Sequence, residues 1–280
     1  MIGARVKSAF SAALVSLLVG CSSSPGLISG GGDSAPARRL DPSAIADAVP
    51  QIEPLSRYGN MRSYVVRGKR YSVMQSSRGY REQGVASWYG TKFHGRRTSS
   101  GEPYDMYAMT AAHKSLPLPT YVRVRNLRNG RSIVVKVNDR GPFHDNRIID
   151  LSYAAATKLG ILGTGTGLVE VAALDPRLAA MKQPAVSAIP AKEKSAAPPA
   201  AKSPDLFIQV GAFSNRSNAD RLRQRLQREL EPPVRIQQSR QAGLEMFRVR
   251  VGPLNDVDQS DAVTRRLAQL GIEDSHIIIE

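Results

Sequence analysis

The sequence predicts a mainly β domain followed by an α+β domain, with irregular segments before and between them. In residues 84–176, short apolar or alternating segments are separated by turn residues, which is typical of a small closed barrel of strands. In residues 204–280, segments with the strand period flank two segments with the helix period. Residues 21–55 and 177–203 are rich in Ser, Gly, Pro, Ala or Lys, so we expect a flexible tether and a disordered linker there.

Residues 1–20 have the composition of a secretory leader. Arg5 and Lys7 precede a short apolar run that is too short to span a bilayer. The run ends in Leu18-Val19-Gly20-Cys21, and this tetrapeptide resembles the lipobox of bacterial lipoproteins. The resemblance implies cleavage before Cys21, the only cysteine of the chain, and attachment of acyl chains to it. An ordinary leader with a coincidental cysteine, or a buried reduced thiol, is the alternative.

The expected lipid anchor also predicts the compartment. Ser22 follows the cysteine, whereas the familiar signal that retains lipoproteins in the inner membrane has Asp at that position. We therefore expect an outer-membrane lipoprotein that faces the periplasm. Several acyl chains, at about 0.8 kcal/mol for each buried methylene, would anchor the protein more firmly than one chain.

The formal net charge of +15 indicates an anionic partner or surface. Nucleic acid is a poor explanation for a protein outside the cytoplasm, so the partner is expected to be a component of the cell envelope. A positive charge that is merely solvated surface is the other interpretation.

Residues 56–83 are expected to form a small hairpin that packs on the following domain, because two strand-like segments flank Arg67-Gly68-Lys69. The strands expected in the barrel domain are residues 85–89, 121–125, 132–137, 148–151 and 168–172. Asn129-Gly130 favours a tight hairpin between the second and third of these strands. One helix is expected over residues 152–159, with Ser152 as its N-cap and Gly160 as its C-terminal stop.

The C-terminal domain is expected to have the element order βαββαβ, the split βαβ or ferredoxin-like arrangement. Its expected strands are residues 206–210, 234–237, 245–251 and 277–279, and its expected helices are residues 215–230 and 256–270. In the first helix Leu222, Leu226 and Leu230 recur every four residues on one face. Ser217, with Asp220 three residues later, is expected to start that helix.

The most concentrated set of candidate site residues surrounds the segment 133–142. Strand-forming residues run directly into Asn138-Asp139-Arg140-Gly141-Pro142, where Gly-Pro ends the strand. Asp139 is therefore expected at the end of a rigid strand with open space ahead of it. From this pattern alone a turn-capping aspartate is the favoured interpretation, because Asp is often used in that way.

Further motifs surround this segment in a fixed order. They are Ala86-Ser-Trp-Tyr-Gly90, Phe93-His-Gly-Arg96, Ser100-Gly-Glu-Pro-Tyr-Asp105, Ala111-Ala-His-Lys114, Leu116-Pro-Leu-Pro119 and Arg147-Ile-Ile-Asp-Leu-Ser152. Together these motifs resemble the rare lipoprotein A (RlpA) family, whose fold is a double-psi β-barrel. Phe207-Ile-Gln-Val-Gly-Ala-Phe213 and Phe247-Arg-Val-Arg-Val-Gly-Pro253 resemble a SPOR domain, a module that binds peptidoglycan strands stripped of their stem peptides.

The resemblance implies a lytic transglycosylase. Active members of the family cleave the bond between N-acetylmuramic acid and N-acetylglucosamine without water, because the muramic 6-hydroxyl attacks its own anomeric carbon. This chemistry needs an acid for the leaving oxygen and a base for the 6-hydroxyl, and one carboxyl can serve as both in sequence. No cofactor is needed, and no metal site is expected because the sequence has no short His or Cys spacing.

Asp139 matches the catalytic aspartate of the family, and the resemblance places Glu102 and His113 in the same groove. An acid must be neutral at the start, so burial or a nearby negative group such as Glu102 is expected to keep it protonated. Glu102 is otherwise a solvated loop carboxylate. Arg140 is expected to point outward to a structural carboxylate such as Asp150. His113 is expected to bind the sugar, to orient Asp139, or to be a polar wall of the groove.

Five other residues are candidates for substrate binding. Trp88 and Tyr89 can stack on sugar faces, although strand alternation lets only one of them face the groove. Asp105 is a weaker candidate, since it is also placed to cap a turn. Gln209 and Arg248 are expected to share a strand face with few apolar residues, which is either a glycan-binding platform or a solvated face.

The sequence therefore predicts a septal lipoprotein that cleaves peptide-free (denuded) glycan strands by endo or exo action. Its expected partners are these strands, the membrane through Cys21, and division proteins, but not nucleic acid. A glycan-binding septal lipoprotein without activity is the alternative. A polysaccharide hydrolase is a third hypothesis, because similar barrels carry that chemistry.

Overall fold

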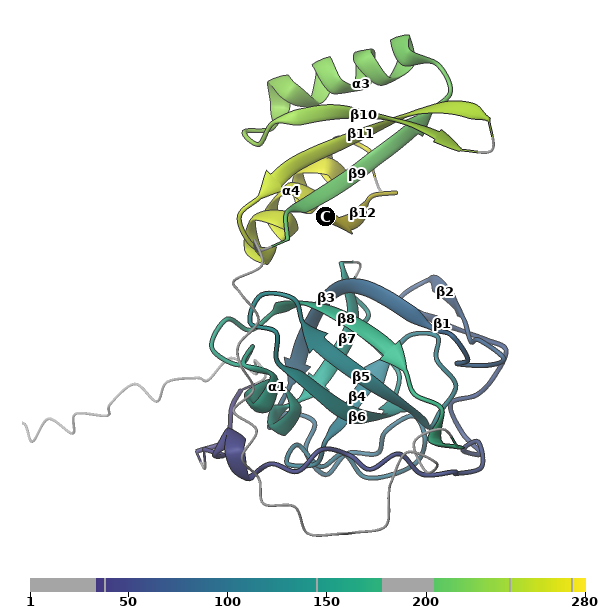
Figure 1. The fold of residues 1–280 in the computed structure, drawn as a ribbon, viewed down its shortest axis with the longest axis vertical. Helices are drawn as coiled ribbons and strands as arrows, with labels where there is room; N and C mark the ends of the chain where they lie inside the picture. Colours follow the sequence, from purple (N-terminus) through teal and green to yellow (C-terminus); the bar gives the residue numbers. More distant parts are fainter. Residues whose placement is uncertain (1–33, 38, 145, 178–203, 242, 273) are drawn as a thin grey trace, which may run out of the picture. The chain divides into compact units, whose positions relative to one another are not determined.

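The computed structural model describes residues 34–37, 39–144, 146–177, 204–241, 243–272 and 274–280 (Figure 1). The expected leader, the expected lipidation site Cys21 and nearly all of the expected linker lie outside these residues. In the part of the chain that is described, no helix is long and apolar enough to cross a membrane.

Six strands form a closed barrel with the neighbour order β3-β7-β4-β6-β5-β8 (Figure 1). They are β3 (Arg81–Tyr89), β4 (Thr110–His113), β5 (Thr120–Asn126), β6 (Ser132–Asp139), β7 (Arg147–Ser152) and β8 (Gly167–Ala173). The β3–β7 and β4–β6 pairs are parallel, and the other four pairs are antiparallel. Closure leaves the sheet without a free edge, which confirms the predicted barrel.

The barrel core fixes the register of β6. Val122 and Val124 of β5 pair with Val135 and Ile133 of β6, and each of the four is at most 1% exposed. Burying a side chain of this size contributes about 1.5–3 kcal/mol. A slip of one residue would turn every side chain of the strand to the opposite face. The position of Asp139 at the end of β6 is therefore set by apolar packing far from it.

The short elements of the barrel domain follow their local sequence signals. The helix α1 (Tyr153–Leu159) begins after Ser152, whose side chain accepts a hydrogen bond from Ala155 N, and it ends at Gly160, where φ is 79°. The strands β1 (Ser63–Val66) and β2 (Lys69–Ser72) form the predicted antiparallel hairpin. The strand β4 was not predicted, because Thr-Ala-Ala-His is too short and too rich in Ala to give a strand signal.

The last part of the predicted tether lies against the barrel. It contains one turn of 3₁₀ helix, η1 (Pro42–Ala44). Ala48 N donates to Val134 O at 3.1 Å, and Lys158 Nζ lies 2.6 Å from Asp47 Oδ1. Leu40, Ile45 and Ala48 also pack on the barrel core. Ordered structure of the barrel domain therefore begins before the predicted hairpin.

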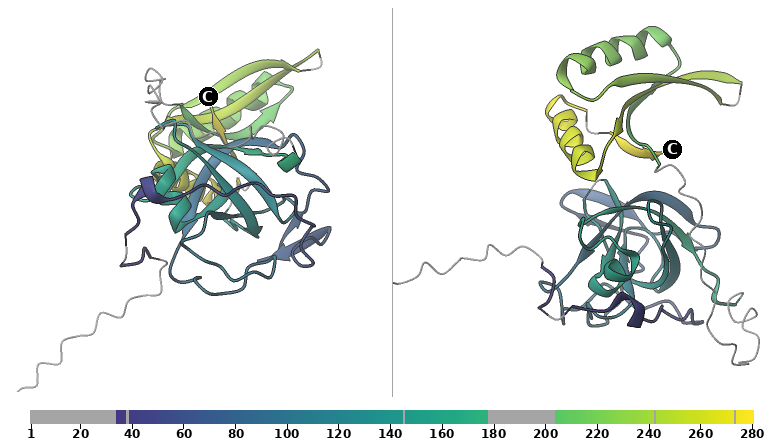
Figure 2. Two further views of the ribbon diagram at one scale, coloured as in Figure 1. Left: turned by 60° about the horizontal axis from the view of Figure 1, so that its bottom comes forward. Right: turned by 60° about the vertical axis from the view of Figure 1, so that its left-hand side comes forward.

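Residues 204–280 form an α+β unit with the predicted βαββαβ order. Its elements are β9 (Leu206–Phe213), α3 (Arg216–Glu229), β10 (Val234–Gln241), β11 (Leu244–Leu254), α4 (Val257–Gln269) and β12 (His276–Ile279). The four strands form an antiparallel sheet with the order β10-β11-β9-β12, and Figure 2 shows the two helices packed on the sheet. Asn215, rather than the predicted Ser217, caps α3, because its side chain accepts a hydrogen bond from Ser217 N.

Candidate active site

Asp139 lies where the pairing of β6 with β4 is irregular. Ala111 pairs with Val137 and Ala112 pairs with Asp139, so the ladder skips Asn138. The Oδ1 atom of Asp139 accepts hydrogen bonds from Ser99 N at 2.8 Å, Ser99 Oγ at 2.7 Å and Arg140 N at 2.7 Å. Within the described residues Oδ2 has no hydrogen-bond partner, so it is the oxygen that is available to exchange a proton with a substrate.

The side chain of Arg140 is buried, and the prediction that it points outward to Asp150 is wrong. Its Nε and Nη2 atoms donate to Gly59 O at 3.0 and 2.7 Å. Its Nη1 atom donates to His113 O at 3.1 Å and to Leu116 O at 2.5 Å. Arg140 therefore ties the end of β6 to the segment before β1 and to the turn after β4. In this way it holds the backbone that positions Asp139.

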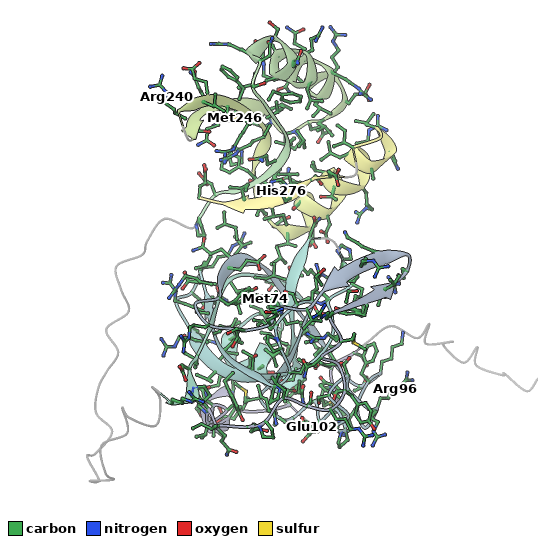
Figure 3. The ribbon with its side chains drawn as sticks, turned by 90° about the vertical axis from the view of Figure 1, so that its right-hand side faces the viewer. Met74, Arg96, Glu102, Arg240, Met246 and His276 are labelled. Carbon is green, nitrogen blue, oxygen red and sulfur yellow. The ribbon has the colours of Figure 1, made fainter. Side chains whose placement is uncertain are left out.

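Glu102 belongs to the loop that also carries Ser99, and this loop lies along the end of β6. Its Oε2 atom accepts a hydrogen bond from Asn138 Nδ2 at 2.8 Å, and its Oε1 atom accepts one from Lys136 Nζ at 2.9 Å. Figure 3 shows Glu102 at the barrel surface. Burial opposes its ionisation, but the hydrogen bonds from Asn138 and Lys136 outweigh burial and lower the pKa of Glu102. Glu102 is therefore a carboxylate, and not a proton donor, at neutral pH.

A second carboxylate joins this network from the N-terminal segment. Lys136 Nζ also donates to Glu53 Oε2 at 2.9 Å, and the Tyr121 hydroxyl donates to Glu53 Oε1 at 2.6 Å. Burial opposes the charge of Lys136, but its contacts with Glu53 and Glu102 outweigh burial and raise its pKa. Neither Glu53 nor Lys136 was predicted from the sequence. The sequence signal for Lys136 was its place as a charged residue in the otherwise largely apolar strand β6.

His113 is 2% exposed, and both of its ring nitrogens are used inside the barrel. Its Nδ1 atom accepts hydrogen bonds from Ser115 N at 3.2 Å and Leu116 N at 3.0 Å. Its Nε2 atom lies 2.8 Å from the Tyr80 hydroxyl, which in turn donates to Glu82 Oε2 at 2.6 Å. These partners make Nδ1 an acceptor and place the ring proton on Nε2. Burial lowers the pKa of His113 to about 3, so the ring is neutral.

Trp88 and Tyr89 are the last two residues of β3, and Asp105 lies in the loop before β4. Tyr89 is 9% exposed and stacks on Tyr104 with ring centroids 4.2 Å apart. Trp88 is partly buried and meets Tyr153 edge to face at 6.2 Å. Asp105 is exposed, and its side chain accepts a hydrogen bond from Tyr107 N at 2.9 Å, which is the turn-capping geometry. Stacking of Trp88 or Tyr89 on a sugar stays a prediction.

A cavity of about 760 Å³ lies beside Ser99, the residue that holds Asp139. This volume is in the range of ligand-binding pockets. Aromatic side chains from the segment before β1, from β1 and from the loop after β6 contribute to its lining, namely Tyr58, Tyr64 and Phe143. The site therefore has an oriented carboxylate next to a partly aromatic hollow. Among the described residues, no three His, Cys, Asp or Glu side chains are grouped as a metal site requires.

In the α+β unit, Gln209 and Arg248 lie on the sheet face opposite the helices. Gln209 pairs with Arg250, which lies two residues beyond Arg248 in β11. The Nε2 atom of Gln209 lies 3.1 Å from Nε2 of His276, and Arg248 Nη1 donates to Ser239 Oγ at 2.8 Å. Figure 3 labels His276 on this unit. The predicted polar face exists, and its role in binding stays a prediction.

Two family models match the chain. Residues 81–171 match a model described as lytic transglycolase, and residues 202–278 match a model described as SPOR domain. The crystal structure of the RlpA SPOR domain from Pseudomonas aeruginosa aligns with 26% of this chain and 96% of that chain. Its sequence identity is 26% and its TM-score is 0.26.

Curated relatives match most of the chain. It is 41% identical to the endolytic peptidoglycan transglycosylase RlpA of Pseudomonas aeruginosa, over 85% of this chain and 82% of the relative. It is 40% identical to the protein of the same name from Vibrio cholerae, over 94% of each chain. Because these relatives align with both the barrel and the α+β unit, the chain belongs to the RlpA family.

Proposed function

We propose that the barrel is an endolytic peptidoglycan transglycosylase that acts on peptide-free strands and leaves 1,6-anhydromuramic ends. The bond cleaved would join N-acetylmuramic acid to N-acetylglucosamine. The observation that supports this most is the asymmetry of Asp139, whose Oδ1 atom is held by three donors while Oδ2 has no partner within the described residues. The names of the curated relatives support the same reaction.

In the simplest scheme Oδ2 of Asp139 serves both proton transfers. The protonated carboxyl gives its proton to the glycosidic oxygen as the bond from that oxygen to C1 breaks. The resulting carboxylate takes the proton of the muramic 6-hydroxyl as O6 bonds to C1. Ser99 and the Arg140 backbone keep the carboxyl oriented. Glu102, which is ionised, would stabilise the positive charge that develops on the sugar ring.

The α+β unit would hold the barrel on its substrate. Its polar sheet face, with Gln209 and Arg248, would bind denuded strands, and a lipid on Cys21 would tether the protein to the outer membrane on the periplasmic side. Linking a binding module to a catalytic module raises the local concentration of substrate without new contacts in the active site. Since denuded strands would be the ligand, the protein would be enriched at the division septum.

The proposal is tested with residues 22–280 and purified peptide-free glycan strands. Mass spectrometry of the products should show new anhydromuramic ends with the native sequence and none with Asp139→Asn. New reducing ends would instead indicate a hydrolase. Strand binding without any new ends would favour a glycan-binding protein and contradict the proposal.

A further inference from the structure

A second aspartate, Asp150, lies at the same level of the barrel sheet as Asp139, with one strand between them. Ala112 of β4 pairs with Asp139 of β6 on one side and with Asp150 of β7 on the other. Directly paired residues point their side chains to the same face of a sheet. The two carboxyl groups therefore share a face, with only the methyl group of Ala112 between them. Two strand spacings of about 4.8 Å put their Cα atoms roughly 10 Å apart.

Contacts from two neighbours support this arrangement. A Cβ atom placed on Gly141 would lie 3.7 Å from Ala112 Cβ and 3.9 Å from Asp150 Oδ2. The Oδ2 atom of Asp150 thus lies beside the turn that directly follows Asp139. Burial, the neighbouring Tyr104 and the charges of both aspartates raise the pKa of Tyr89, which packs in one cluster with Ala112.

The hydroxyl of Tyr89 is buried, and the side chain of Thr110 is the hydrogen-bonding group beside it. Tyr89 lies on β3, the strand next to β7 in the barrel.

The surroundings of Asp150 differ from those of Glu102. Its Oδ1 atom accepts a hydrogen bond from Ser87 Oγ, which also accepts one from Arg147 Nη1 at 3.0 Å. Burial raises the pKa of Asp150, and this outweighs the opposing effects of Ser87, Arg147, Lys114 and His144. Asp150 is partly buried and has no partner for Oδ2 within the described residues. It thus retains a proton more readily than a solvated aspartate does.

We propose that Asp150 is a further catalytic residue, which donates the proton to the glycosidic oxygen while Asp139 serves as the base. The inference rests on the proposed function and transfers one of the two roles of Asp139 to its neighbour across Ala112. The bond from C1 to the glycosidic oxygen breaks and the bond from C1 to O6 forms. The proton of Asp150 goes to the leaving oxygen, and the proton of the 6-hydroxyl goes to Asp139. Exchange with water then restores both groups.

The two aspartates share one face of the sheet with their Cα atoms roughly 10 Å apart, a spacing that leaves room for a glycosidic bond between their carboxyl groups. In glycoside-cleaving enzymes the two carboxyl groups that flank the scissile bond are roughly 5 to 9.5 Å apart. Glu102 does not fill the acid role, because its hydrogen bonds with Lys136 and Asn138 keep it ionised. The structure therefore offers one carboxyl group held by three donors and a second whose pKa is raised by burial, an asymmetry that acid–base catalysis can use.

The test compares the native chain, residues 22–280, with Asp150→Asn and Asp139→Asn on peptide-free strands across a range of pH. Asn has the size of Asp, and its side-chain oxygen can still accept the Ser87 hydrogen bond. Because burial of the ionised form is unfavourable, Asp150→Asn should unfold at no lower a temperature than the native chain at pH 7. We expect strand affinity within twofold of native and a rate at least about 100-fold lower, as for loss of a general acid.

A second variant keeps the carboxyl group. Ser87→Ala removes a hydrogen bond that lowers the pKa of Asp150, so Asp150 should stay protonated to a higher pH. The alkaline limb of kcat/KM should therefore move to higher pH, whereas Ser132→Ala, an exposed serine at the start of β6, should leave it in place. If the alkaline limb of kcat/KM for Ser87→Ala stays in place or moves to lower pH, the inference is contradicted.

The remaining outcomes separate the inference from the proposed function. If Asp139→Asn is inactive but Asp150→Asn keeps the native rate and pH profile, the inference is overturned and the proposed function stands. If the native chain makes no anhydromuramic ends, both are overturned. If Asp150→Asn is slow with intact strand binding and an unchanged unfolding temperature, the inference is supported.

Discussion

The Nε2 atom of His113 and the hydroxyl of Tyr80 lie 2.8 Å apart inside the barrel. Because the other ring nitrogen accepts hydrogen bonds from Ser115 N and Leu116 N, the imidazole has no site left for substrate. The carbonyl groups of His113 and Leu116 in turn hold the guanidinium of Arg140. We therefore expect His113 to act on Asp139 through the turn that it closes, as a positioning residue.

Replacement of His113 by Asn and by Ala should separate positioning from proton transfer. The Asn side-chain oxygen can take the place of Nδ1 and accept from Ser115 N and Leu116 N, whereas Ala leaves both donors buried and unpaired. An unpaired buried donor costs about 1–3 kcal/mol. We expect His113→Asn to cleave strands within about tenfold of the native rate, and His113→Ala to be less stable and far slower. Equal inactivity of the two variants, with a native unfolding temperature for Asn, would show that the imidazole itself takes part in the chemistry.

The stability of the protein should also depend on the protonation of His113. Burial lowers its folded pKa to about 3, below the ordinary value of 6.5. The stability that the neutral ring provides is therefore fully present above about pH 6.5, and it is lost as the pH falls toward 3. Urea unfolding at several pH values should give a steeper loss for the native chain than for His113→Asn in this range. Parallel curves would contradict a buried neutral imidazole.

Lys136 should stabilise the protein because its positive charge lies between the carboxylates of Glu53 and Glu102. Lys136→Met leaves Glu53 and Glu102 without their shared cation, so we expect the pKa of Glu102 to rise and the free energy of unfolding at pH 7 to fall. These carboxylates are partly exposed, so a loss of about 1 kcal/mol is expected. Adding Glu53→Gln to Lys136→Met should restore part of that loss. If the double variant loses more free energy of unfolding than the two single variants together, the network is contradicted.

Arg248→Ala should weaken binding of denuded strands without altering the products. Arg248 lies on the polar face of the sheet, whereas Arg228 is exposed on α3, which packs on the other face. Arg228→Ala removes the same charge and is the matched control. We expect an affinity loss of about threefold to tenfold for Arg248→Ala alone, measured by co-sedimentation with strands. Equal losses for both variants would indicate that only the overall charge matters.

Local signals in the sequence predicted the elements that depend on neighbouring residues. The hairpin around Gly68, the α1 boundaries at Ser152 and Gly160, and the order of the C-terminal unit were all predicted from turns, caps and periods. The strand β4 was missed because four residues with two alanines carry little propensity, and only its two neighbours make it a strand.

Features that depend on distant pairing could not be predicted in this way. The Arg140 side chain points inward because it donates to the carbonyl groups of Gly59, His113 and Leu116. These residues are distant from Arg140 in the sequence, so no local pattern predicts the contacts. The placement of Asp150 beside Asp139 depends on the order of three strands around the barrel. The resemblance identified Asp139 as a candidate, but its three donors, and the oxygen that has no partner among the described residues, required the register of β6.

Cleavage of peptide-free strands in water labelled with heavy oxygen tests the central proposal most directly. Attack by the muramic 6-hydroxyl leaves the new ends one water lighter than reducing ends and without label, and Asp139→Asn should abolish these ends. Label in the new ends, or anhydromuramic ends formed by Asp139→Asn at the native rate, would contradict a transglycosylase that depends on Asp139.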